Sequence, residues 1–230
     1  TITHASALLT LAGAGLVAAA GTTALAPIKL QSGTNLTTAA AGAVEFDGTA
    51  FYATAAASSR QVVNTTQFVT VGATPVALSN SSTGVQNVFD AANDVLTLAA
   101  STTYFFECMY YINTGATTHT TATGFVASSA FTSIRYFAEL WSTTAVTIST
   151  TAPSVLDVVA STATVLNATS AATRTTIRCR GIIRTNGAST VTPQITFSAG
   201  PTGTCEVATN SYFRIWPVGS NTVAAVGNWA

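Results

Sequence analysis

The sequence predicts an all-β protein: an antiparallel β-sandwich or jelly roll, preceded by a small extended N-terminal segment with a β-hairpin. From Gln61 onward, short runs of β-branched and aromatic residues alternate with Gly, Asn, Pro and Ser. About ten such runs, spaced by about 8 to 15 residues, are typical of a sandwich or jelly roll. No segment combines a helical period of 3.6 with a cap. We therefore divide the chain into residues 1–60, for oligomerisation or attachment, and residues 61–230, a jelly-roll domain.

The N-terminal segment has three parts. An Ala/Gly/Leu stretch begins at Ala5, a short strand is expected over Ala26–Gly33, and a hairpin is expected over Val44–Thr54. In the hairpin, Asp47-Gly48 separates two apolar runs, and this dipeptide is favoured in tight β-turns. This segment should contain a strand pair with a small core.

The strands of the sandwich are expected within the β-rich runs of the second part. These runs are residues 68–72, 75–80, 85–89, 94–100, 102–114, 131–141, 154–160, 175–187, 190–200 and 210–219. Asp90–Asn93 is predicted to be a turn between two of them.

The run Thr175–Thr185 shows the clearest alternation of side chains. Successive side chains of a strand point to opposite faces. One face therefore carries Ile177, Cys179, Gly181 and Ile183, and the other carries Arg178, Arg180, Ile182 and Arg184. We expect the first face in the core and the second, basic face outside it.

The run Tyr104–Ile112 has aromatic residues on both faces, with Phe106 on one and Phe105 and Tyr111 on the other. An antiparallel sheet usually leaves one face to water, so a second layer should cover this strand. That layer is either another sheet or a neighbouring subunit.

Composition favours self-association. The chain is 48% hydrophobic and 7% charged, with a formal net charge of zero, and near-zero net charge promotes association. The alternative is that Thr, Ser and Asn side chains solvate the surface, as on many secreted β-proteins. A nucleic-acid partner is not expected, because the arginines are balanced by acids on a chain without net charge and leave no electrostatic footprint for it.

Membrane insertion is not expected either. The longest apolar candidate, Ala5–Pro27, contains Ser6, three threonines and three glycines, whereas a membrane-spanning helix needs about 20 predominantly apolar residues.

No metal or cofactor is predicted. The three cysteines, Cys108, Cys179 and Cys205, are widely spaced, and the chain has only two histidines, His4 and His119. We expect free thiols in the core, although a disulfide between two of them is possible. His119, in a polar loop or edge strand, is expected to be solvated or at an interface.

No catalytic motif occurs, and the eight carboxylates are few. Glu107 and Glu139 lie in strongly apolar runs and need partners there. The expected partners are the arginines Arg135, Arg178, Arg180, Arg184 and Arg214. The alternative is a carbohydrate site that uses arginine, tyrosine and Trp141. Trp141, Trp216 and Trp229 are interpreted chiefly as core or interface residues.

Residues Ala26–Tyr52 resemble a module of tailed-bacteriophage fibre and virion proteins. The matching residues are Ala26–Leu30, Ser32–Thr34, Leu36–Thr38, Ala41–Gly48 and Phe51–Tyr52. The run VFDAANDVLTLAASTTYFFE, the run THTTATGF and the C-terminal run from Asn210 are also similar to phage structural sequence. Ala39 and Ala40 depart from the module, which often has Pro-Glu there. The resemblance implies a fibre, tailspike-associated or head-fibre protein, usually trimeric, with a tumour-necrosis-factor-like jelly roll.

The function expected from these features is that of a non-enzymatic virion subunit, a fibre or fibre tip that assembles as a homotrimer. Its partners would be other tail or capsid proteins and a glycan or protein of the host surface. Host contact is expected at the loops Gly115–Thr123 and Ser142–Thr151. The alternatives are a capsid decoration or head-fibre protein and, third, a polysaccharide depolymerase.

Overall fold

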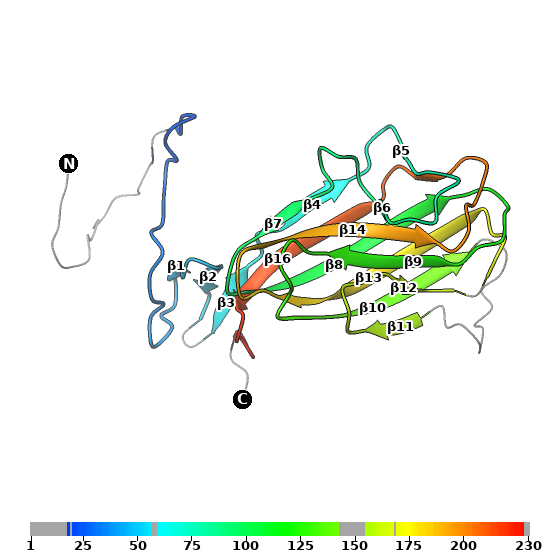
Figure 1. Cartoon of the computed structure of the whole chain (residues 1–230). Coiled ribbons are helices and arrows are strands. Elements are labelled where there is room, and N and C mark those ends of the chain that lie inside the picture. Colours follow the sequence, from blue (N-terminus) through cyan, green and yellow to red (C-terminus); the bar gives the residue numbers. More distant parts are fainter. Residues whose placement is uncertain (1–17, 19, 57–58, 143–154, 168, 228–230) are drawn as a thin grey trace.

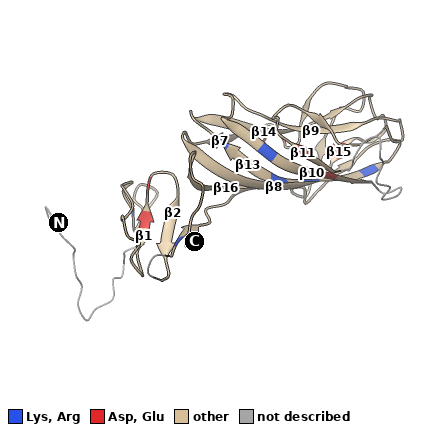
Figure 2. Cartoon of the chain, turned by 90° about the horizontal axis from the view of Figure 1, so that it is seen from below, with Lys and Arg blue, Asp and Glu red and all other residues tan. Residues whose placement is uncertain are grey.

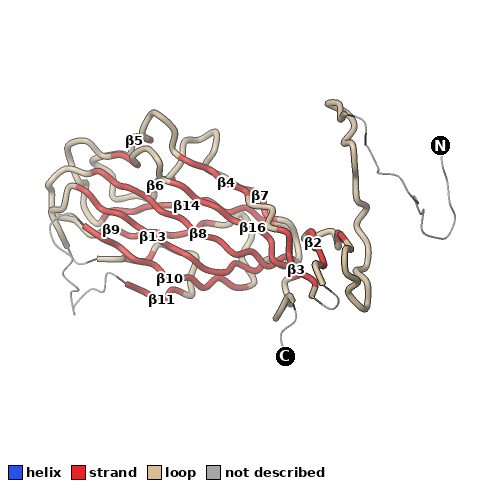
Figure 3. The backbone as a smooth tube through the Cα atoms, turned by 180° about the vertical axis from the view of Figure 1, so that it is seen from behind, coloured by secondary structure: helices blue, strands red, loops and turns tan. Residues whose placement is uncertain are grey.

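The computed structural model describes residues 18, 20–56, 59–142, 155–167 and 169–227. These residues form strands, turns and loops and contain no helix (Figure 3). No helix long and apolar enough to cross a membrane therefore occurs in the described part of the chain. The Ala/Gly/Leu stretch lies almost entirely outside the described residues. The prediction of an all-β chain is confirmed.

The strands fall into a small sheet and two larger ones. The small sheet contains β1 (Val44–Phe46), β2 (Phe51–Thr54) and β3 (Arg60–Val63), in that order. The eight-stranded sheet contains β4 (Gln67–Thr70), β5 (Val76–Ala77), β8 (Thr102–Asn113), β10 (Ser133–Ser142), β11 (Val155–Val158), β13 (Arg174–Arg184), β15 (Glu206–Val207) and β16 (Tyr212–Ser220). The five-stranded sheet contains β6 (Gln86–Asn87), β7 (Leu96–Leu98), β9 (Thr121–Val126), β12 (Thr164–Val165) and β14 (Ser189–Phe197).

The two larger sheets form an antiparallel sandwich (Figure 1). The chain crosses between them repeatedly: β7 is followed by β8 in the other sheet, then β9, then β10, and later β13, β14 and β16 alternate in the same way. The eight-stranded sheet has the order β11-β10-β13-β8, and β8 then pairs with β16 and β15, which pair in turn with β4 and β5. This arrangement confirms the β-sandwich and jelly-roll class.

The core lies between the facing sides of the two sheets. Its centre is a group of aromatic rings in contact: the ring of Phe106 lies 4.8 Å from that of Phe125 and 5.8 Å from that of Phe213. Tyr136 packs edge-on against Phe125, with ring centroids 5.0 Å apart. Because these rings come from β8, β9, β10 and β16, they join strands that are far apart in the sequence.

The predicted two-faced character of residues 175–185 is confirmed. Ile177, Cys179 and Ile183 of β13 are fully buried, and Arg178, Arg180 and Ile182 are exposed. Gly181 lies on the buried side, where a Cβ atom would meet the carbonyl oxygen of Arg135 at 2.3 Å. A glycine is required there because β10 approaches closely.

The small sheet contains the predicted hairpin. β1 and β2 pair antiparallel, and Gly48 in the turn has φ = +90°, a value that favours glycine. β3, which was not predicted as its third strand, continues three residues past position 60.

The prediction of a strand over Ala26–Gly33 is wrong. These residues run as an exposed extended segment with no strand partner among the described residues. One backbone hydrogen bond ties the segment to the hairpin, from Gly33 N to Phe46 O. A single such bond does not make a ladder, so the segment stays outside the sheet.

The interpretation of Gly115–Thr123 as a free loop is also wrong for its last residues. Thr121–Thr123 are buried and begin β9, which pairs with β14 inside the five-stranded sheet. The sequence hides this strand because its inward residues include two threonines instead of large apolar side chains. Ser142–Thr151, the other expected host-contact loop, lies outside the described residues except for Ser142.

Candidate self-association face

The outer side of the eight-stranded sheet carries the arginines, carboxylates and aromatic rings that the sequence singled out. We call this surface the outer face and define it by the outward side chains of β4, β16, β8, β13, β10 and β11. The strand registers place these side chains in rows across the sheet. One row contains Asp157, Phe137, Arg180, Glu107, Arg214 and Phe68.

Glu107 is held at the centre of that row. Arg214 Nη2 lies 2.7 Å from Glu107 Oε1, and the hydroxyl of Tyr212 donates to the same oxygen at 3.4 Å. Burial and the nearby Glu107 charge raise the pKa of Tyr212. Arg180 lies opposite Glu107 on β13, but no carboxylate among the described residues pairs with it.

Two further ion pairs lie on the outer face. Glu139 lies 3.9 Å from Arg178, a loose contact, and Glu139 Oε2 is buried without a hydrogen-bond partner. Arg135 Nε donates to Asp157 at 3.0 Å. The hydrogen bonds from this guanidinium lower the pKa of Asp157. Three of the five arginines named as partners, Arg135, Arg178 and Arg214, thus pair with carboxylates; Arg184 instead donates to the carbonyl oxygens of Asn221 and Val223.

Aromatic rings fill the outer face between the ion pairs. The rings of Phe105 and Trp216 are 4.8 Å apart, and the Arg214 guanidinium lies 5.5 Å from the Trp216 ring centroid. Phe68 stacks on Tyr212 with centroids 5.9 Å apart. Several large side chains remain exposed: Phe68 (60%), Ile182 (41%), Phe137 (40%), Trp141 (37%) and Tyr111 (37%).

This composition is that of a protein interface. Aromatic residues, Met and Arg are enriched in interface cores, and Lys is depleted. The outer face has Met109 at its centre and no lysine, although it also carries the acids Glu107, Glu139 and Asp157. In Figure 2 the ribbon as a whole carries few charged segments, and several of them lie on this sheet. The second layer predicted over residues 104–112 is not supplied by the chain's own sheets, since Tyr111 and Phe105 face outward.

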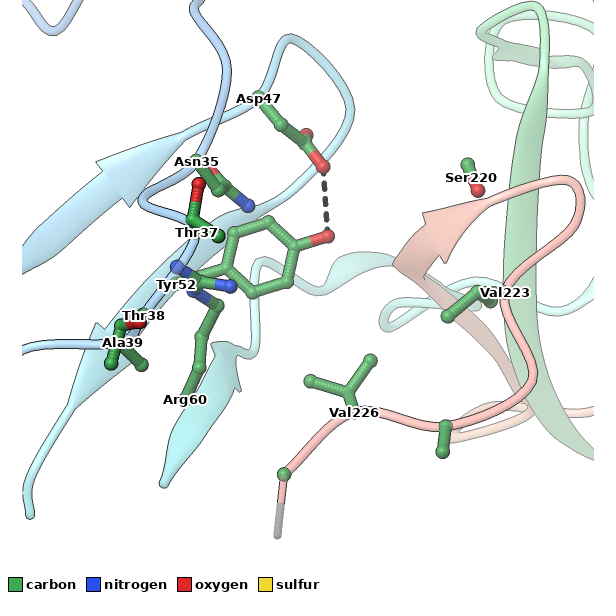
Figure 4. Close-up of a pocket in the computed structure, with 12 residues that line it drawn as sticks. Asn35, Thr37, Thr38, Ala39, Asp47, Tyr52, Arg60, Ser220, Val223 and Val226 are labelled. Atoms are coloured by element: carbon green, nitrogen blue, oxygen red, sulfur yellow. Dashed lines mark hydrogen bonds between the residues drawn. The ribbon is translucent and has the colours of Figure 1, made fainter. Parts of the chain in front are cut away.

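A hollow lies between the small sheet and the C-terminal residues (Figure 4). Tyr52 and Asp47 meet in it, with the tyrosine hydroxyl donating to Asp47 Oδ2 at 2.9 Å. Arg60 lies beside them, with its guanidinium under the Tyr52 ring, and Val223 and Val226 of the C-terminal segment line the other side of the hollow. Asp47 also accepts the backbone N–H groups of Thr49 and Ala50, so its oxygens organise the hairpin turn.

Glu45 and Arg60 fasten the extended segment to the small sheet. Arg60 Nε donates to Glu45 Oε2 at 2.8 Å, and the backbone N–H of Leu36 donates to Glu45 Oε1 at 2.6 Å. The hydrogen bond from Arg60, and next that from Leu36, lowers the pKa of Glu45.

Acid should therefore release the extended segment from the hairpin. Because folding lowers the pKa of Glu45, its stabilising contribution is present above the unfolded-state pKa of about 4.5 and is lost as the pH falls through the lower folded-state pKa. We expect the hydrogen-exchange protection factor of the Leu36 amide to fall as the pH is lowered from 6 to 3. Glu45→Gln should show reduced protection at pH 6 and little further pH dependence. Equal protection at both pH values in the natural chain would contradict this role.

The remaining candidate residues are structural. The interpretation of His119 as solvated is wrong: it is buried, its Nδ1 lies 2.7 Å from the Thr117 carbonyl oxygen, and its ring packs edge-on to Phe197. The three cysteines are buried and free, as predicted. Burial raises the pKa of Cys179, and it raises that of Cys205 to about 11. Cys108 and Cys179 are direct neighbours across β8 and β13.

The described residues contain no group of three His, Cys, Asp or Glu side chains that could hold a metal ion. Glu107 and Glu139 lie on β8 and β10, on either side of β13. Glu107 pairs with Arg214 at 2.7 Å, whereas Glu139 makes only the loose contact with Arg178. Trp229 lies outside the described residues.

Phe68 and Met109 were missed as members of the outer face. The alternation within their strands could have identified them, because Met109 shares its parity with Phe105 and Glu107. The cross-strand partners could not have been found in this way. No family model, curated protein or solved structure matches this chain.

Proposed function

We propose that this chain is a non-enzymatic structural subunit of a bacteriophage particle, a fibre or fibre tip that assembles as a homotrimer through the outer face. The single observation that carries the self-association is the composition of that face: exposed aromatic and aliphatic side chains between internally paired charges. Burying such side chains is favourable by about 25 cal/mol per Å2 of apolar surface. Because the carboxylates of this face are paired with arginines of the same chain, they should cause little electrostatic repulsion between the outer faces of two copies.

The virion assignment depends on the resemblance of Ala26–Tyr52 to the phage module. The fold of this region supports an attachment role. Its extended part exposes Leu25, Ile28 and Leu36, and nothing else in the described chain covers them. An extended segment with exposed apolar side chains is suited to packing against other subunits or another virion protein.

Light scattering tests the homotrimer directly. The purified full chain should have a mass of about 70 kDa, three times the 23.3 kDa of one chain. A stable 23.3 kDa monomer at micromolar concentration would refute the self-association.

The position on the particle is tested by electron microscopy with a labelled antibody against this chain. Label at the tail would support the fibre, whereas label over the capsid would favour the alternative of a decoration or head-fibre protein. Particles without label would contradict both.

Catalysis is tested separately. Because Glu107 and Glu139 are both paired with arginines, the purified protein should release no new reducing ends from host surface polysaccharide. Sustained release would establish the depolymerase alternative.

A further inference from the structure

The chain's charges divide into those that pair internally and those that do not. It has eight cationic and eight acidic side chains, all among the described residues. Four ion pairs, formed by Arg60, Arg135, Arg178 and Arg214, use four of each. The residues left without an ion pair in the described chain are Lys29, Arg174, Arg180 and Arg184, and Asp47, Asp90, Asp94 and Glu206. Four cationic and four acidic side chains of the described chain therefore remain without an ion pair.

Arg180 is the most informative of the unpaired cations. It lines a hollow of about 410 Å3 on the outer face together with Phe137, Glu139 and Arg178. Glu139 is the single acid in this lining and is already in contact with Arg178. The hollow therefore carries one excess positive charge beside the exposed ring of Phe137. A surface that presents a carboxylate next to an apolar side chain would be complementary to it.

The unpaired acids Asp90 and Asp94 lie together in the turn between β6 and β7. Asp90 accepts the Ala92 N–H, and Asp94 accepts from the Asn87 side chain at 2.6 Å; neither has a cationic partner in the described chain. Between and beside them Ala91, Ala92 and Val95 are exposed. We call residues 90–95 the acidic turn. It presents a carboxylate with apolar neighbours, which is the complement of the Arg180 hollow.

The two surfaces lie on opposite sides of the sandwich. The hollow belongs to β10 and β13, near the β11 edge, whereas the acidic turn packs beside β4 at the other edge, where Phe68 and Asp94 line a common pocket. Figure 1 shows β4 and β7 on one side of the sandwich and β10 and β11 on the other. One copy therefore offers the hollow in one direction and the turn in another. Such a heterologous contact repeats from copy to copy and forms a closed ring where the rotation between copies closes, as it would after three copies in the proposed homotrimer.

We infer that the acidic turn of one copy docks in the Arg180 hollow of the next, with Asp90 or Asp94 pairing with Arg180. This inference rests on the proposed self-association and names the two surfaces that meet. It explains why Arg180 forms no ion pair with a carboxylate in the described part of its own chain. It also explains how a chain of zero net charge associates in one direction, since unlike charges face each other across the contact.

A charge swap tests the contact by analytical ultracentrifugation at about 0.15 M salt. Arg180→Glu should weaken assembly at least tenfold, as should Asp90→Lys combined with Asp94→Lys. Combining all three changes should bring the dissociation constant back to within about threefold of the natural chain. Val165→Asp, which adds a negative charge on β12 of the other sheet, should leave assembly unchanged. Full assembly of a folded Arg180→Glu chain, or no recovery in the combination, would overturn the inference.

A cross-linking experiment gives an independent answer that does not depend on charge reversal. Arg180→Cys chains mixed with Asp94→Cys chains should be joined by a short bis-maleimide, while either variant alone should not be joined between these positions. The natural cysteines are buried and should not react. Absence of the mixed product from assembled chains would refute the contact. A natural chain that is monomeric would instead refute the proposed function, so the two failures are distinguishable.

Discussion

Replacing Phe106 by alanine is expected to lower the free energy of unfolding by about 3–5 kcal/mol, the usual cost of removing a buried phenylalanine. Phe106 is fully buried, and its ring contacts Phe125, Phe213 and Tyr136 from three other strands. Its loss would leave a cavity where both sheets meet. For a chain of this length, about 1 kcal/mol corresponds to about 2–4 °C in Tm, so the Tm should fall by about 6–20 °C.

Val165→Ala is the control for this change. The Val165 side chain is 51% exposed and lies on β12, away from both the core and the outer face. Thermal unfolding followed by circular dichroism, at one fixed protein concentration, should show a much smaller decrease in Tm. Equal decreases for the two variants would contradict the placement of the core between the sheets.

Replacing Ile182 by aspartate is expected to dissociate the assembly while leaving each subunit folded. Ile182 lies on the outer face and is 41% exposed, so a carboxylate there is solvated in the free chain. In an assembled contact the same carboxylate would be desolvated, at a cost of several kcal/mol unless it is paired. We expect the dissociation constant to rise about thirtyfold or more, equivalent to about 2 kcal/mol.

Light scattering across a dilution series measures that change. Val165→Asp is the control: Val165 is a similar, half-exposed β-branched residue, but it lies on β12 of the other sheet. It should leave the mass unchanged. If Val165→Asp dissociates the assembly and Ile182→Asp does not, the outer face is not the surface of contact.

Much of the fold could be predicted because strand side chains alternate. In β13 the apolar residues Ile177, Cys179 and Ile183 alternate with polar ones and so predict the buried side of the strand, and all three are buried in the structure. The turn chemistry of Asp47-Gly48 predicted the hairpin in the same local way. β9 could not be predicted, because Thr121 and Thr123 are buried by the pairing with β14 and not by their own hydrophobicity.

The candidate site was predictable only in part. Apolar surroundings indicated that Glu107 and Glu139 need arginine partners, and strand parity placed Arg178 and Arg180 on one face. Which arginine serves which carboxylate depends on the register between strands that are distant in the sequence. β16 comes more than 100 residues after β8, yet it brings Arg214 to Glu107.

The sequence by itself thus determined an all-β chain, the inward and outward sides of β13, the hairpin at Asp47-Gly48 and the buried thiols. These features follow from local periodicity and turn conformation. Only the tertiary structure decided that Arg180 forms no ion pair among the described residues, that the acidic turn lies at the far edge of the sandwich, and that aromatic side chains stay exposed on the outer face. Those features depend on which strands become neighbours, and strand pairing is a long-range property that no single stretch of the chain encodes.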